Sequence, residues 1–154
     1  MNRSTFLYVT YIRTTQERLW SALTEDTEFM QQYWFGVKCL SQWQAGSSWK
    51  MDHGGGRITD EGEIVESQPP KRLVIRWRHL ADPQAAAEGD AFCTMELEPF
   101  GSAIKLTVTH TSEREHSKLI EKVSGGWPKI LANLKSLLET GSVVLDEAYP
   151  APKG

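Results

Sequence analysis

Four histidines and a cluster of acidic residues are the side chains of this sequence that could carry metal or acid–base chemistry. The histidines are His53, His79, His110 and His116. Their spacing does not match the paired-histidine motifs that hold zinc, so we expect no metal site. His79 and His110 fall at the ends of predicted strands, whereas His116 lies in a mixed charge run, which is typical of a solvated loop.

The acidic cluster lies on or near one predicted strand and consists of Asp60, Glu61, Glu63 and Glu66. Two nearby carboxyl groups can act as acid and base when their surroundings separate their pKa values. Strand alternation, however, places Glu61 and Glu63 on one face and Asp60 on the other. This pattern favours a solvated strand edge whose acidic groups pair with Lys50 or Arg76 on neighbouring strands.

The segment His53-Gly54-Gly55-Gly56 is similar to the glycine-rich loop that supplies the oxyanion hole of some esterases. That chemistry also needs a nucleophilic serine in a G-x-S-x-G turn, and the sequence contains none. A glycine run between two strands is more simply a hairpin turn. We therefore expect a turn here, and we assign no catalytic residue.

Large aromatic side chains are the unusual feature of the composition, with six tryptophans in 154 residues. The predicted helix pair, several predicted strands and the last predicted helix contribute Trp34, Phe35, Trp49, Trp77, Phe92 and Trp127. So many rings either pack into a solid core or line a cavity that accepts a small apolar molecule. The residues alone leave both interpretations open.

Alternating patterns predict strands over most of the chain. After a first strand over residues 5–13, we expect two short helices, one capped by Thr14 or Thr15 and one over about 26–33. Further strands are predicted over residues 37–42, 48–53, 58–67, 73–79, 92–97 and 104–109. Turn residues separate these strands at short intervals, which indicates an antiparallel sheet. The polar, alanine-rich segment 81–89 predicts a loop.

The last predicted element is an amphipathic helix that begins at Trp127, after Gly125-Gly126, with Pro128 in its first turn. Its apolar stripe consists of Trp127, Ile130, Leu131, Leu134, Leu137 and Leu138. Gly141 stands where a left-handed C-cap ends such a helix. The predicted fold class is therefore α+β, with a curved antiparallel sheet of about six or seven strands around one long C-terminal helix.

Size and charge narrow the possible functions. A chain of 154 residues with 40% hydrophobic residues fits one globular domain. A net charge of −3 is unlike that of a general nucleic-acid binder, and no apolar run is long enough to span a membrane. The N-terminus lacks a signal-peptide pattern, and Cys39 and Cys93 form no disulfide framework, so we expect a cytoplasmic protein.

Four segments carry a likeness to a known family: residues 11–24, residues 62–73, Ile75-Arg76-Trp77, and the run from Gly126 to Gly141. They resemble the START-like and polyketide-cyclase-like (SRPBCC) superfamily. Within it, they are most similar to the group named after the C-terminal domain of the activator of the heat-shock-protein-90 ATPase. The resemblance implies a helix-grip fold and an apolar cavity. We expect one such domain over residues 1–154, with its core at about 5–141 and a tail at 142–154.

We therefore expect a protein that binds a small hydrophobic or aromatic molecule between the sheet and the C-terminal helix. The expected wall combines the six aromatic residues named above with Ile130, Leu131 and Leu134, and no cofactor is implied. One alternative is an enzyme of the cyclase or hydratase kind, for which Glu63, His79 and His110 are the candidate acid–base residues. Another is a protein-interaction module, either a homodimer or the partner of a chaperone.

Overall fold

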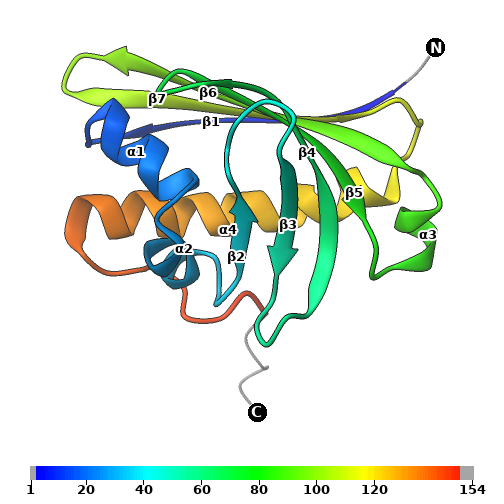
Figure 1. Ribbon diagram of the computed structural model, residues 1–154. Coiled ribbons are helices and arrows are strands. Elements are labelled where there is room, and N and C mark those ends of the chain that lie inside the picture. Colours follow the sequence, from blue (N-terminus) through cyan, green and yellow to red (C-terminus); the bar gives the residue numbers. More distant parts are fainter. Residues whose placement is uncertain (1–2, 150–154) are drawn as a thin grey trace.

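Within residues 3–149, which the structure describes, seven antiparallel strands form one sheet that curves around the longest helix (Figure 1). The structure is a computed structural model. The helices are α1 (Gln16–Leu23), α2 (Thr27–Tyr33), α3 (Pro83–Ala86) and α4 (Lys118–Thr140). The strands are β1 (Ser4–Ile12), β2 (Lys38–Ser41), β3 (Ser48–Asp52), β4 (Ile58–Gln68), β5 (Arg72–His79), β6 (Asp90–Phe100) and β7 (Ala103–Ser112). Their order in the sheet is β1-β7-β6-β5-β4-β3-β2.

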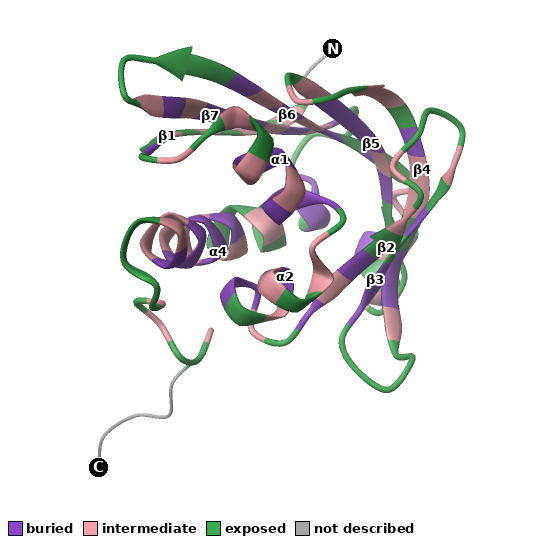
Figure 2. Ribbon diagram, turned by 60° about the vertical axis from the view of Figure 1, so that its left-hand side comes forward, coloured by how far each residue is buried: buried purple, intermediate pink, exposed green. Residues whose placement is uncertain are grey.

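Helices α1, α2 and α4 lie on the inner side of the curved sheet (Figure 1). α4 packs against β1 and β7, while α2 packs against both β2 and α4. Figure 2 shows the sheet bending around α4, with buried residues alternating with less buried ones along the strands. The predicted α+β class and helix-grip arrangement are confirmed, and the strand count is at the upper end of the expectation.

Alternation of side chains decides which face of each strand is buried. In β7, Ile104, Leu106, Val108 and His110 are buried and point inward, while the residues between them are only partly buried. β6 follows the same rule with Ala91, Cys93, Met95 and Leu97. One face of the sheet therefore carries the core, and the other meets solvent.

Side-chain caps hold the first two helices where the sequence predicted them. Thr15, rather than Thr14, begins α1, because its hydroxyl oxygen accepts a hydrogen bond from the Arg18 amide at 3.1 Å. Asp26 begins α2 in the same way, accepting from the Phe29 amide at 3.2 Å. At the other end of the chain, Gly141 ends α4 with a φ of 87°, which confirms the predicted left-handed cap.

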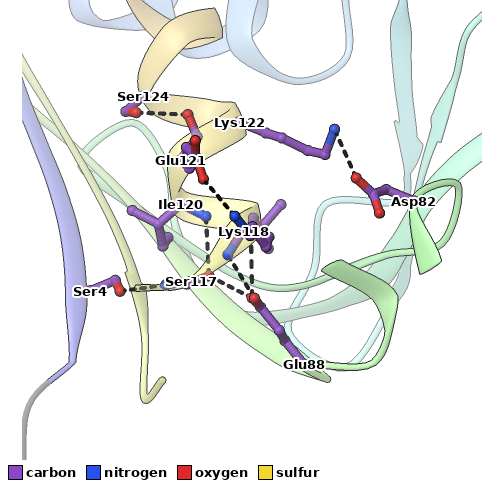
Figure 3. Close-up of polar contacts among 10 residues, drawn as sticks. Ser4, Asp82, Glu88, Ser117, Lys118, Ile120, Glu121, Lys122 and Ser124 are labelled. Atoms are coloured by element: carbon purple, nitrogen blue, oxygen red, sulfur yellow. Dashed lines mark hydrogen bonds and ion pairs between the residues drawn. The ribbon is translucent and has the colours of Figure 1, made fainter. Parts of the chain in front are cut away.

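The start of α4 differs from the prediction. The helix begins at Lys118, nine residues before Trp127, and Pro128 lies in its interior. Ser117 caps it by accepting from the Ile120 amide at 3.2 Å. The Glu88 carboxylate accepts from the Ser117 hydroxyl and from the Lys118 amide, both at 2.6 Å (Figure 3). These contacts satisfy the free amides of the first turn and so stabilise the start of the helix, ahead of the two glycines and the proline.

The segment 81–89 also differs from the expected plain loop. It contains the short helix α3, capped by Asp82, and Ala85 in that helix is fully buried. The same segment also contains Glu88, whose carboxylate lies at the beginning of α4. Ala85 is the one buried residue of this segment, whereas Ala81, Gln84 and Ala87 are exposed.

The chain after α4 turns back along the helix. Asn133 of α4 is fully buried, and its Oδ1 accepts hydrogen bonds from the amides of Val144 at 3.0 Å and Leu145 at 2.8 Å. Its Nδ2 donates to the Leu145 carbonyl at 2.9 Å. The first part of the predicted tail is thus fixed against α4, whereas residues 150–154 lie outside the described residues. In the part of the chain that is described, no helix is long and apolar enough to cross a membrane.

Candidate functional site

A pocket of about 340 Å³ lies between the first half of α4 and strands β3 to β5. Its volume falls in the range of about 300–1,000 Å³ that is usual for small-molecule sites. The pocket is lined by Trp34, Met51, His53, Asp60, Trp77, His79, Leu119, Lys122, Val123, Gly126, Trp127, Ile130 and Tyr149. Aromatic and aliphatic side chains form most of this wall, and a few polar groups interrupt it.

Four of the residues predicted for the cavity wall line this pocket: Trp34, Trp77, Trp127 and Ile130. Trp34 follows α2, Trp77 lies on β5 and Trp127 lies on α4. The ring of Trp127 lies 5.3 Å from that of Trp34 and 6.1 Å from that of Trp77, centroid to centroid. Tilted rings at these separations make favourable contacts and hold one another in place.

Four other predicted residues lie behind or beside the pocket. Trp49 packs against Trp77 and is only 1% exposed. Leu131 and Leu134 are buried in the core of the molecule. Phe35 is partly buried against that core and adopts a positive φ of 54°. None of these four belongs to the pocket lining.

Phe92 does not belong to the pocket wall, which corrects the predicted residue set. It is 40% exposed, on the outer face of β6. Its neighbours Ala91 and Cys93 are buried on the inner face, so strand alternation sends the Phe92 ring to the solvent side.

The free volume of the pocket depends partly on Gly126. This residue faces the pocket from the middle of α4, and a Cβ placed on it would meet no atom within 4 Å. The absence of a side chain there leaves room between the helix and the strands.

A buried carboxylate, Asp60, is the centre of the polar part of the pocket. Asp60 is only 4% exposed, and three hydrogen-bond donors lie close to its two carboxylate oxygens. The Thr59 hydroxyl donates to Oδ1 at 2.7 Å, and Trp77 Nε1 donates to Oδ2 at 2.7 Å. His79 Nδ1 lies 2.9 Å from the same Oδ2. The carboxylate is therefore well satisfied by hydrogen bonds despite its burial.

The position of Asp60 corrects the interpretation of the acidic cluster as a solvated edge. Asp60 pairs in register with His79 on β5, and both side chains point to the inner face. The interpretation holds for Glu63, which is half-exposed and lies 3.9 Å from Arg76. Glu63 thus faces solvent, away from the pocket.

The hydrogen bond to Asp60 determines the tautomer of His79. A carboxylate oxygen can only accept, so Nδ1 carries the proton, and in the neutral ring Nε2 is an acceptor. Within the described residues, Nε2 has no protein partner. His79 lines the pocket with a side chain that is 14% exposed, so Nε2 is the nitrogen left for a bound molecule.

His110 is enclosed behind the pocket wall. It is fully buried, and its Nδ1 accepts a hydrogen bond from Trp127 Nε1 at 3.3 Å. Its ring lies 4.8 Å from that of Trp77. Burial lowers the pKa of His110 to about 3, so this imidazole is neutral at physiological pH. It supports the tryptophans and does not reach the pocket.

The remaining polar groups lie where the pocket meets solvent. Lys122 forms an ion pair of 3.1 Å with Asp82, which joins α4 to the segment before α3 (Figure 3). His53 follows β3, and burial, followed by the charge of Arg57, lowers its pKa. The predicted turn after it is confirmed, since Gly54, Gly55 and Gly56 all adopt positive φ values. Tyr149 also lines the pocket and is largely exposed, with Lys129 Nζ 4.1 Å from its ring centroid.

Metal and thiol chemistry find little support among the described residues. No group of three or more His, Cys, Asp or Glu side chains could hold a metal ion there. Cys39 and Cys93 are free and buried, and burial raises the pKa of both thiols. Buried thiols of this kind act as small apolar side chains.

Solved structures share this fold. CalU16 from Micromonospora echinospora is 19% identical, with a TM-score of 0.70 over 89% of this chain and 77% of CalU16. The Aha1 dimer from Colwellia psychrerythraea is 21% identical, with a TM-score of 0.70 over 90% of this chain and 98% of that one. PFC0360w from Plasmodium falciparum, described as an HSP90 activator, is 19% identical, with a TM-score of 0.68 over 87% and 95% of the two chains. At these identities the likeness establishes the fold.

A comparison with curated proteins found no match. A family model does match, over residues 13–139, and the family is described as Activator of Hsp90 ATPase homolog 1-like protein. The matched range begins at the residue after β1 and ends in the last turn of α4, and so contains strands β2 to β7 and the helices described above. The chain therefore belongs to the family of Activator of Hsp90 ATPase homolog 1-like proteins.

Proposed function

We propose that this protein binds small apolar or aromatic molecules in the pocket between α4 and strands β3 to β5. The observation that supports this most strongly is the pocket itself, about 340 Å³ in volume with three tryptophans in its wall. The tryptophans come from three distant segments of the chain, so the wall exists only in the folded protein. The two buried, free cysteines suit a reducing compartment, and we place the protein in the cytoplasm.

Burial of apolar surface supplies the binding free energy in this proposal. Each Å² of apolar surface removed from water contributes about 25 cal/mol before the cost of association is subtracted. The rings of Trp34, Trp77 and Trp127 offer flat apolar faces, which suit planar ligands. The rigid packing of these rings against one another reduces the ordering that a ligand must impose.

Native mass spectrometry of the purified protein tests the proposal. A small molecule that co-purifies, and that organic extraction releases, supports binding and identifies the ligand. The variant Gly126→Leu fills the pocket and should lack the added mass. Since Gly125 lies on the exposed side of the same helix turn, Gly125→Leu is the matched control and should retain it. An added mass of equal abundance in both variants would place the ligand elsewhere.

The Asp60–His79 pair favours an enzyme as the second candidate function. A histidine oriented by a carboxylate is an arrangement that serves general acid–base catalysis. Of the three candidate residues, only His79 lines the pocket, while Glu63 faces solvent and His110 is enclosed. Turnover of an extracted ligand that is lost in His79→Asn would support an enzyme of the cyclase or hydratase kind.

A protein partner is the third candidate, and it concerns another surface. Leu7, Val9 and Tyr11 are exposed along β1, and the Tyr11 ring lies 5.1 Å from that of the exposed Phe100. One structural neighbour is a dimer, and another is described as an HSP90 activator. The native spectrum distinguishes monomer from homodimer, and a pull-down with a heat-shock-protein-90 chaperone tests the other partner.

A further inference from the structure

We propose that the pocket selects aromatic molecules that carry a hydroxyl group, because His79 presents Nε2 to the bound molecule as a fixed hydrogen-bond acceptor. This inference rests on the proposed function and adds a chemical class of ligand to it. The favoured ligands are phenols and enols of planar ring systems.

The pairing of β4 with β5 fixes the orientation of the His79 ring. Asp60 of β4 and His79 of β5 are direct register partners, so their side chains meet across the strands. The distance from Nδ1 to Oδ2 is 2.9 Å, and the two side chains are only 14% and 6% exposed. The ring therefore cannot turn to exchange its two nitrogens without leaving a buried carboxylate oxygen short of a donor.

Asp60 is itself held in place. Thr59 and Trp77 each donate to it at 2.7 Å, and the Trp77 indole is fixed by its contacts with Trp49 and Trp127. A rigid carboxylate fixes the tautomer of the histidine, and so fixes which nitrogen accepts. The arrangement is complete before any ligand enters.

The donors beside the Asp60–His79 pair are already engaged. The Thr59 hydroxyl and Trp77 Nε1 both donate to Asp60, and the Lys122 ammonium, which pairs with Asp82 at 3.1 Å, is half-exposed. The His53 side chain lies at the exposed end of the pocket. A ligand hydroxyl can donate to Nε2, whereas the corresponding methyl ether has no hydrogen to donate, leaves this acceptor without a bond and loses affinity. An anionic ligand would also lie close to the Asp60 carboxylate, which further favours a neutral hydroxyl.

Calorimetric titration with 2-naphthol and with 2-methoxynaphthalene tests the inference. In the second compound a methyl group replaces the hydroxyl hydrogen, so only 2-naphthol can donate a hydrogen bond. Wild-type protein should bind 2-naphthol about ten-fold more tightly, the effect of one buried hydrogen bond. In His79→Asn the amide nitrogen can still donate to Asp60, but the atom at the Nε2 position is lost. That variant should bind both compounds with the affinity that wild type has for the ether.

His79→Gln is the complementary variant, because its amide oxygen can occupy the Nε2 position. It should retain a preference for 2-naphthol that His79→Asn lacks. Retained binding of the ether shows that the pocket of each variant is intact. Equal affinity of wild type for the two compounds, or an unchanged preference in His79→Asn, overturns the inference while leaving the proposed function standing. Binding of neither compound overturns both.

Discussion

The indole rings of Trp49 and Trp77 meet with their centroids 4.4 Å apart, across the one residue of β4 that has no side chain. That residue is Gly62, which pairs in register with Trp49 on β3 and with Trp77 on β5. A Cβ built on Gly62 would lie 1.7 Å from the carbonyl oxygen of Arg76. The glycine thus permits the close approach of the strands, and with it the position of the Trp77 ring in the pocket wall.

The first prediction concerns this contact. Gly62→Ala should lower the free energy of unfolding by more than about 2 kcal/mol, because the new methyl group can fit only if β4 and β5 move apart. Gly125→Ala is the control, since a Cβ there meets nothing within 4 Å, and it should stabilise α4 by about 0.5–1 kcal/mol. Urea denaturation of both variants provides the measurement. A neutral Gly62→Ala would show that the strands are not tightly joined at this position.

The second prediction concerns the segment after α4. Asn133→Ala should release Val144 and Leu145, because the lost amide group binds the backbone of both residues. Hydrogen exchange of these two amides should accelerate, and the melting temperature should fall, as expected when buried backbone groups lose their partners.

Asn133→Asp separates the two roles of this amide. Its carboxylate can still accept from the Val144 and Leu145 amides, but it cannot donate to the carbonyls of Tyr33 and Leu145. Exchange at Val144 and Leu145 should therefore be slower than in Asn133→Ala. Identical protection of these amides in wild type and Asn133→Ala would mean that another contact holds the segment.

The third prediction follows from the burial of His110. Its pKa is about 3 in the folded protein and about 6.5 when unfolded, so the unfolded chain binds the extra proton between these values. The contribution of neutral, buried His110 to the free energy of unfolding is fully present above about pH 6.5 and is lost as the pH falls toward 3. Between about pH 7 and pH 5, the free energy of unfolding of the wild type should fall by on the order of 2 kcal/mol because of this residue.

The matched variant for this measurement is His110→Asn, whose side-chain oxygen can still accept from Trp127 Nε1 and does not titrate. Its stability should depend less steeply on pH over the same interval in denaturation experiments. His53, whose pKa is also lowered, contributes a slope of the same sign in both proteins, so the difference between them isolates His110. Parallel pH profiles would contradict the burial of a neutral imidazole.

The fold was predictable from periodicity because its strands and helices have clear patterns. The start of α4 was missed for a physical reason: Gly125, Gly126 and Pro128 are typical of a helix boundary. The contacts that keep the helix intact before them come from Glu88, which is 30 residues from Lys118 in the sequence. No local pattern shows such a contact.

The candidate site was only partly predictable. Trp34, Trp77 and Trp127 were found because large rings from the helix pair, a strand and the last helix are expected to meet in the folded protein. The exclusion of Phe92 could have been read from the alternation of β6, in which Ala91 and Cys93 occupy the inner face. Asp60 was assigned to a solvated edge because its partners, Trp77 and His79, lie on the neighbouring strand and are recognised only from the register.

A nuclear magnetic resonance titration of the tryptophan indole N–H signals tests the central claim most directly. Addition of 2-methoxynaphthalene should shift the signals of Trp34, Trp77 and Trp127, which line the pocket. The signals of Trp20 and Trp43, which are not part of the lining, should remain in place and act as internal controls. Gly126→Leu should abolish the three shifts. Unchanged signals in wild type, or shifts confined to Trp20 and Trp43, would contradict ligand binding in this pocket.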